Sequence, residues 1–172
     1  MIYDNVSISK LPESPLGPVW VAVTPEGLVV LEIQATMDKF VEGLKKRGFK
    51  DIHPESEMAV QAASQVGEYL AGKRQSFDFP IDWQVLKSFQ RQVLQATFAI
   101  PYGKTATYAQ IAIQIGKPRA ARAVGRAEAT NPMPLVIPCH RVLGSDGKLH
   151  GYGAAQGLVT KAWLLRLETG EQ

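Results

Sequence analysis

Short apolar runs separated by turn residues mark the first third of the chain. Residues 19–23 and 28–33 are almost wholly apolar, and Thr-Pro-Glu-Gly at 24–27 separates them. Apolar runs bounded by such residues are typical of β-strands, so we predict a hairpin with residues 14–18 leading into it.

Apolar positions then recur at the three- and four-residue spacing of a helix. We predict helices over residues 36–47 and 56–71, the second ended by Gly72. Residues 77–83 contain Pro80 and are expected to be extended. We place the boundary between two lobes there.

The second half of the chain favours helices. Its apolar spacing predicts four, which carry residues 89–98, 108–115, 120–127 and 158–167. Ser88 and Thr107 are expected to cap the first two, and Gly116 to end the second.

The second and third of these helices are separated only by Lys117-Pro118-Arg119, as in a helix-turn-helix. Two alanine-rich helices that simply pack closely would give the same pattern, and that alternative stays open. We predict an α+β fold. Residues 1–84 form a small N-terminal lobe with a β-sheet and helices, and residues 85–172 form a helical C-terminal lobe with the helix-turn-helix.

The number of cysteines indicates the cellular compartment. Cys139 is the one cysteine in 172 residues. A lone thiol forms no intramolecular disulfide, which is typical of a reducing compartment, and we expect a cytoplasmic protein. No apolar stretch has the length of a membrane span and the N-terminus lacks the layout of a signal peptide, so we expect no membrane partner.

Positive charge is concentrated between residues 101 and 141. This segment holds six basic residues and one acidic residue, Glu128, although the whole chain has a net charge of only +3. Such a concentration is typical of proteins that bind the phosphate backbone of nucleic acids. A solvated helix surface is the alternative.

Cys139 lies between an apolar run at 135–138 and the basic pair His140-Arg141. Nearby positive charge favours the thiolate, which is the nucleophilic form of cysteine, so we expect Cys139 to be a nucleophile. Adjacent side chains of an extended segment point to opposite faces, and we therefore expect a water to bridge Cys139 and His140. Taken alone, His140 is better explained as a structural histidine.

The residues around Cys139 resemble the O6-alkylguanine-DNA alkyltransferases. The similarity rests on the motif Pro-Cys-His-Arg-Val at 138–142, with Asn-Pro at 131–132 before it and Gly-Tyr at 151–152 and Lys-Ala-Trp at 161–163 after it. It is strong over residues 88–168 and weak over the first 80. The resemblance implies direct-reversal DNA repair. An alkyl group passes irreversibly from O6 of guanine, with O4-alkylthymine as a further substrate, to the sulfur of Cys139. No cofactor is implied.

The resemblance also implies a role for each candidate catalytic residue. His140 is the base for Cys139 through a water, Glu168 orients His140, and Tyr108 donates a hydrogen bond toward the guanine. Without the resemblance, Glu168 would be a solvated acid at a helix end and Tyr108 a partly buried core residue. Arg141 is expected to be structural. The residues implied to bind the substrate or shape its site are Asn131, Val142, Tyr152, Gly153 and Ala154.

The implied partner is double-stranded DNA that carries an alkylated guanine, bound through its minor groove by a monomer. Arg122 is implied to enter the space that the flipped-out nucleotide leaves. A phosphate contact is the alternative for this arginine. The residues implied to contact DNA are Thr107, Arg119, Ala120, Ala121, Arg122, Gly125 and Arg126.

The chain differs from the family in one loop, and several alternative functions are compatible with parts of its sequence. The loop between Tyr152 and Trp163 is longer than in many members, which leaves the range of alkyl groups open. No metal is expected, because the zinc site of some relatives needs cysteines that the N-terminal lobe lacks. The main alternative, a non-catalytic protein that binds alkyl lesions, is disfavoured by the presence of Cys139. A methylation-responsive transcription factor and a cysteine hydrolase are disfavoured as well, the first for want of a Cys-rich domain and the second for want of a second placed histidine.

Overall fold

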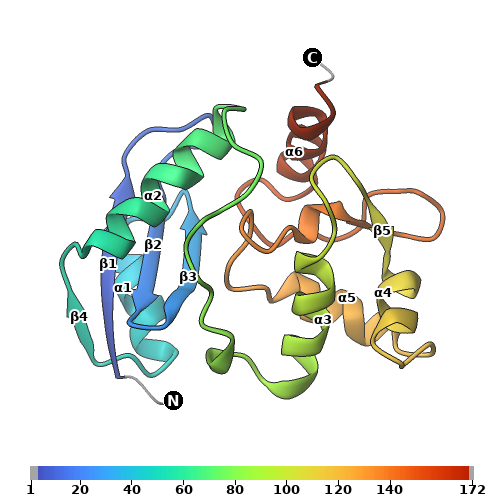
Figure 1. The fold of residues 1–172 in the computed structure, drawn as a ribbon, viewed down its shortest axis with the longest axis horizontal. Helices are drawn as coiled ribbons and strands as arrows, with labels where there is room; N and C mark the ends of the chain where they lie inside the picture. Colours follow the sequence, from blue (N-terminus) through green and yellow to red (C-terminus); the bar gives the residue numbers. More distant parts are fainter. Residues whose placement is uncertain (1–3, 171–172) are drawn as a thin grey trace. The chain divides into compact units, whose positions relative to one another are not determined.

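A four-stranded sheet is built around the predicted hairpin (Figure 1). The computed structural model describes residues 4–170. The hairpin strands β2 (Val19–Thr24) and β3 (Gly27–Ile33) pair antiparallel, as predicted, and β1 (Asn5–Leu11) pairs antiparallel with β2. The short strand β4 (Asp51–His53) adds in parallel to β1, which gives the order β3-β2-β1-β4. Strands β1 and β4 are not among the predicted elements.

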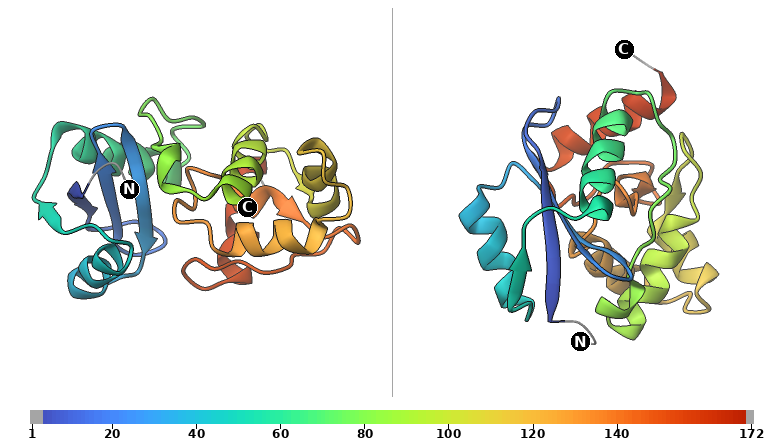
Figure 2. Two further views of the ribbon diagram at one scale, coloured as in Figure 1. Left: turned by 90° about the horizontal axis from the view of Figure 1, so that it is seen from below. Right: turned by 60° about the vertical axis from the view of Figure 1, so that its left-hand side comes forward.

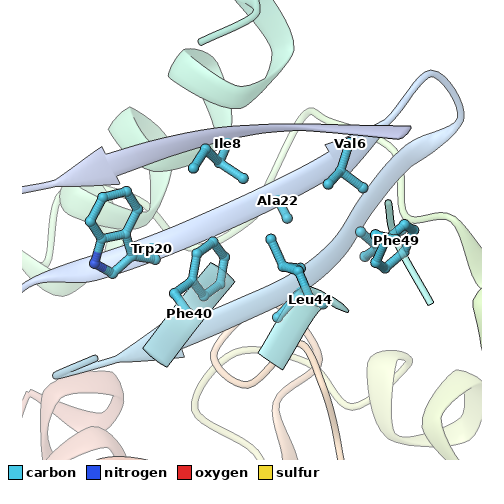
Figure 3. Packing of buried hydrophobic residues seen from close by; sticks show 9 residues of the cluster. Val6, Ile8, Trp20, Ala22, Phe40, Leu44 and Phe49 are labelled. Atoms are coloured by element: carbon cyan, nitrogen blue, oxygen red, sulfur yellow. The ribbon is translucent and has the colours of Figure 1, made fainter. Parts of the chain in front are cut away.

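Two helices cover the opposite faces of this sheet, and both were predicted. These are α1 (Met37–Lys46) and α2 (Glu57–Leu70), capped by the side chains of Thr36 and Ser56 (Figure 2). Figure 3 shows the apolar core between the sheet and α1, where the rings of Trp20 and Phe40 stack with centroids 5.6 Å apart. Strand β2 is buried along its whole length because helices cover both of its faces.

The segment that follows α2 returns to the hairpin. The backbone N–H of Leu28 donates to the carbonyl of Pro80, and Ile81 forms a parallel bridge with Leu28. A side chain at Gly27 would collide with the Pro80 carbonyl, so glycine is needed where the two segments meet. The predicted extended segment is confirmed in part: Ile81 forms the bridge, whereas Trp83, the last residue of that segment, begins the short 3₁₀ helix η1 (Trp83–Val85).

The chain forms two compact units, Met1–Val85 and Leu86–Gln172. The second unit is mainly helical. Val93, Ile111, Val124 and Val142 lie in its core. The four helices and the shorter elements between them are α3 (Ser88–Phe98), β5 (Ala106–Thr107), α4 (Tyr108–Gln114), α5 (Ala121–Ala129), η2 (Cys139–Arg141), β6 (Val142–Leu143) and α6 (Leu158–Thr169). The predicted α+β fold is therefore confirmed.

The helix ends agree with the predictions at some positions and not at others. Thr107 caps α4 in a full capping box with Gln110, and Gly116, with φ of 72°, follows its end. Ser88, by contrast, is the first residue of α3 and not its cap; the cap is Lys87, which makes no side-chain capping bond. Helix α6 contains the predicted residues 158–167 and continues through Glu168 to Thr169.

No helix among residues 4–170 is both long enough and apolar enough to span a membrane.

Candidate active site

Cys139 opens a single turn of 3₁₀ helix, and its side chain is buried. The N–H of Cys139 donates to the Ile137 carbonyl, and that of Arg141 to the Pro138 carbonyl. The expectation of an extended segment was therefore wrong. Proline at 138, with its fixed φ, leads directly into the turn, so Cys139 and His140 lie on a tight bend instead of alternating across a strand.

Asn131 closes the loop that leads to this turn. Its side-chain amide nitrogen donates to the Ile137 carbonyl at 2.9 Å, and its amide oxygen accepts from the N–H of Met133 at 2.9 Å. The Asn131 side chain thus satisfies two backbone groups of the loop 131–137, one carbonyl and one N–H. This fixes the position of Cys139 relative to the end of α5.

His140 and Glu168 form a fully buried pair. His140 Nε2 and Glu168 Oε1 are 2.7 Å apart, and neither side chain is exposed to solvent. Burial lowers the pKa of His140, although Glu168 opposes this effect. The neutral ring donates its Nε2–H to the carboxylate, which leaves the lone pair of Nδ1 as the basic site of the ring.

Arg141 neutralises the carboxylate that His140 contacts. Its Nε and Nη2 donate to Glu168 at 2.9 Å each, and its Nη1 donates to the carbonyl of Ile100. The N–H of Gly103 also donates to Glu168, at 3.0 Å. Glu168 therefore links the segment before β5 and the Cys139 turn to α6, and Arg141 extends this link to Ile100, just after α3. Such a charge is stable in a buried position only because several donors surround it.

The resting thiol is not activated in the way that the sequence suggested. Burial raises the pKa of Cys139 to about 12, and the charge of Glu128 acts in the same direction. The expected help from the basic pair is missing because His140 is neutral and Arg141 is paired with Glu168. At pH 7 a pKa of about 12 leaves only about one thiol in 10⁵ ionised. Attack by Cys139 thus requires a base that takes the proton during the reaction.

Lys161 is a buried lysine. It belongs to the Lys-Ala-Trp motif, but the sequence predicted no role for it. Its Nζ donates to the carbonyls of Val142 at 2.7 Å and His150 at 2.9 Å, and it lies 3.5 Å from the hydroxyl of Tyr108. Burial lowers the pKa of Lys161. A lysine in the first turn of an amphipathic helix normally reaches solvent, so the pattern alone gave no signal for this position.

Tyr108 begins α4 and lies beside this lysine. Its hydroxyl donates to the His150 carbonyl at 3.0 Å, and Lys161 Nζ is 5.7 Å from the centre of its ring. Burial raises the pKa of Tyr108 to about 12, so the hydroxyl stays protonated and can donate at neutral pH. A side chain at Gly125 of α5 would contact the ring of Tyr108, with its Cβ 3.9 Å from the ring.

The loop before α6 holds the remaining candidate residues for substrate binding. The hydroxyl of Tyr152 is buried and, among residues 4–170, has no hydrogen-bond partner; burial raises its pKa well above the usual value. A side chain at Gly153 would lie 2.8 Å from the Ala129 carbonyl, so the loop backbone runs against the end of α5. Ala154 is half-buried, and its carbonyl accepts the N–H of Gly157.

The candidate DNA-contacting residues lie on α5 and in the turn before it. Arg119, Arg122 and Arg126 are exposed. Arg122 and Arg126, four residues apart, lie on one face of α5, and Arg119 lies in the turn before it. The opposite face holds Val124 and Ala127 in the core. Thr107, Ala120, Ala121 and Gly125 are half-buried.

The structure also separates surface charge from buried charge in residues 101–141. Glu128 and Arg141 are buried, whereas the other basic residues of this segment are exposed: Lys104, Lys117, Arg119, Arg122 and Arg126. The exposed charge of this segment is therefore +5, the same as its net charge in the sequence, and no exposed acidic side chain interrupts it. Among residues 4–170, no three His, Cys, Asp or Glu side chains form a group that could hold a metal ion.

Comparisons with known proteins agree across the whole chain. The family model of the 6-O-methylguanine DNA methyltransferase ribonuclease-like domain matches residues 8–83, and that of the DNA binding domain matches residues 88–170. The methylated-DNA–protein-cysteine methyltransferase of Methanosarcina barkeri is 45% identical over 169 residues, which are 98% of this chain and 97% of that protein.

Two further comparisons extend the similarity. The constitutive methylated-DNA–protein-cysteine methyltransferase of Bacillus subtilis is 36% identical over 156 residues, 91% of this chain and 92% of that protein. The crystal structure of Mycobacterium tuberculosis OGT in complex with DNA matches with a TM-score of 0.78 at 36% identity, over 96% of this chain and 94% of that chain.

Proposed function

Because the chain belongs to the 6-O-methylguanine DNA methyltransferase family and repairs DNA by transferring an alkyl group to a cysteine, we propose that Cys139 is the acceptor. The protein is a methylated-DNA–protein-cysteine methyltransferase, and its proposed substrate is O6-alkylguanine in duplex DNA. The observation that carries the assignment is the buried series Cys139, His140 and Glu168, which supplies a nucleophile, a base and a carboxylate that orients the base.

In the proposed reaction the sulfur of Cys139 attacks the alkyl carbon. The S–C bond forms while the C–O6 bond breaks, and the electron pair of that bond stays on the guanine. The thiol proton passes to Nδ1 of His140 through a water molecule and ends on N1 of the released guanine. The products are a thioether on Cys139 and unmodified guanine, so each protein molecule reacts once.

His140 is a weak base in its resting state, and the buried carboxylate compensates for this. Nε2 of His140 lies 2.7 Å from Oε1 of Glu168, so the negative carboxylate stabilises the imidazolium that forms during the transfer. Arg141 weakens this stabilisation of the imidazolium, because its positive charge is paired with the same carboxylate. The proton is consequently held only briefly and is returned as the guanine leaves.

Tyr108 is the proposed donor to the departing base. Its high pKa keeps the hydroxyl protonated, and in the proposed step the hydroxyl turns from the His150 carbonyl to the guanine. A hydrogen bond to the ring of the leaving guanine stabilises the negative charge that develops there. The carbonyls of Cys139 and Val142 and the N–H of Gly153 are the proposed partners of the guanine edge.

The protein binds DNA, and we place this contact on α4 and α5. The small side chains of α5 suit the minor groove, and its exposed arginines suit the flanking phosphates. Arg122 is the proposed occupant of the space left by the flipped-out nucleotide. In this division of labour residues 85–172 bind DNA and transfer the alkyl group, residues 1–84 support them, and the protein acts as a cytoplasmic monomer.

The test is the intact mass of the protein after incubation with a duplex that carries one O6-methylguanine. We expect a stoichiometric exchange of one hydrogen for one methyl group, mapped to Cys139, and none with the unmodified duplex. Cys139→Ala is the matched control, expected to bind the duplex and to gain no mass. Tight binding by the natural protein with unchanged mass would instead identify a lesion-binding protein.

A further inference from the structure

Glu128 is a buried acid in the same unit for which neither the reaction nor the family resemblance provides a role. It lies on the inner side of α5, only 5% exposed. Its Oε1 is hydrogen-bonded to the hydroxyl of Thr97 on α3, and within the described part of the chain its Oε2, also buried, has no hydrogen-bond partner. An ionised carboxylate with a buried, unpartnered oxygen is strongly disfavoured.

The hydrogen bonds of Thr97 indicate which form Glu128 takes. The Thr97 hydroxyl lies 3.0 Å from the Val93 carbonyl as well as within bonding distance of Glu128. A hydroxyl has one proton, and a carbonyl only accepts. Both bonds are satisfied together only when Glu128 carries a proton and donates it to Thr97, which then donates to Val93.

The charged and titratable groups that face Glu128 come from three elements. Lys161 of α6 attracts its negative charge, whereas the ionised forms of Cys139 in η2 and Tyr108 of α4 repel it. From α3 the facing group is Thr97, which does not titrate. Burial raises the pKa of Glu128 to about 7, although the charge of Lys161 opposes this.

We propose that Glu128 controls the reactivity of Cys139 by its charge: the neutral acid permits transfer of negative charge to the sulfur, and its ionisation opposes it. The inference rests on the proposed role of Cys139 as acceptor. Glu128 does not touch the reacting atoms and acts through the field at the sulfur. A negative charge in a buried site disfavours a second one nearby far more than it would in water.

The test compares pH profiles of methyl transfer for the natural protein and for Glu128→Gln. Glutamine keeps the donor to Thr97 and removes the charge. Single-turnover rates are measured with free O6-methylguanine base as well as with the methylated duplex, so that changes in DNA binding are separated from changes in transfer. Glu42→Gln, an exposed acid on α1, is the matched control.

We expect the two proteins to react equally fast at about pH 5.5 and Glu128→Gln to be faster by about threefold or more at about pH 8.5, with both substrates. Glu42→Gln should follow the natural profile throughout. Parallel profiles for the natural protein and Glu128→Gln would overturn the inference while leaving the role of Cys139 intact. Absence of transfer at every pH would instead contradict the proposed function.

A direct titration covers the case in which Glu128→Gln folds poorly. In the natural protein, the carboxyl ¹³C signal that Glu128→Gln lacks should titrate about two pH units above an ordinary glutamate. Glu128→Gln should also raise the rate at which iodoacetamide alkylates Cys139, and only at pH values where Glu128 of the natural protein is ionised. A Glu128 signal that titrates like those of exposed glutamates would overturn the proposal.

Discussion

The ammonium group of Lys161 donates a hydrogen bond of 2.7 Å to the carbonyl of Val142, three residues after Cys139. A second bond, of 2.9 Å, goes to the His150 carbonyl. One buried side chain of α6 therefore fixes both the strand that follows Cys139 and the loop that Tyr108 contacts.

Replacement of Lys161 by methionine is expected to destabilise the protein by about 2–4 kcal/mol, because two buried carbonyls lose their donor. Urea unfolding measures this change. Lys148→Met, at an exposed position of the same loop, should change stability by less than about 0.5 kcal/mol. Equal stability of the two variants would contradict the structural role of Lys161.

Glu168→Gln is expected to remove about 3 kcal/mol of stability, because it leaves the buried guanidinium of Arg141 without its carboxylate. Methyl transfer should also slow by at least about tenfold, since His140 loses the group that stabilises its protonated form. Thermal unfolding and single-turnover transfer test the two effects. Asp146→Asn, which alters an exposed acid paired with His150, is the control and should leave both nearly unchanged.

Arg122→Ala is expected to slow repair in duplex DNA far more than reaction with the free alkylated base. The duplex reaction requires a flipped nucleotide, whereas the free base enters the pocket unaided. The ratio of the two single-turnover rates is the measurement. Equal slowing of both would show that Arg122 acts on the transfer step or on folding.

Arg126→Ala is expected to weaken DNA binding and to lower the slope of log K against log salt by about 1, the value for one lost phosphate contact. Arg126 is exposed on the same face of α5 as Arg122. Fluorescence anisotropy with an undamaged duplex at several salt concentrations gives the slope. Lys39→Ala, at an exposed position of α1, should leave the slope unchanged, and an equal loss there would argue against a specific role for α5.

Glu128 also predicts a dependence of stability on pH. Its pKa is raised to about 7 in the folded protein, so the folded state binds the proton more tightly than the unfolded state. This contribution is complete below the unfolded pKa and is lost as the pH rises through about 7. Glu128→Gln should therefore gain about 2 kcal/mol relative to the natural protein between about pH 5 and pH 8. Urea unfolding at both pH values measures the gain, and a constant difference would contradict the raised pKa.

The predictable parts of the fold are those with a local signal. The hairpin, both N-terminal helices and the capping box of Thr107 follow from neighbouring residues. Strand β4 has three residues, too few for a period, and forms by pairing with a strand more than forty residues away. Strand β1 does carry a local signal, because its apolar residues Val6 and Ile8 alternate with serines, although it is not among the predicted elements.

For the candidate site, the sequence named residues that the structure brings into contact, His140 and Glu168, but not their protonation. The neighbours of Cys139 in the chain are basic, yet its pKa depends on burial and on an acid eleven residues earlier. Lys161 and Glu128 look like ordinary charged helix residues in the sequence. Their burial follows from how α5 and α6 pack, and that is a property of the assembled unit.

The two units of the chain differ in the sign of their charge. Residues 86–172 hold eleven basic and four acidic side chains, whereas residues 1–85 hold eight basic and twelve acidic ones. A polyanion therefore attracts one unit and repels the other. As the protein diffuses toward a duplex, we expect this contrast to turn residues 86–172 toward the DNA before any atom is in contact, so that fewer encounters occur in the wrong orientation.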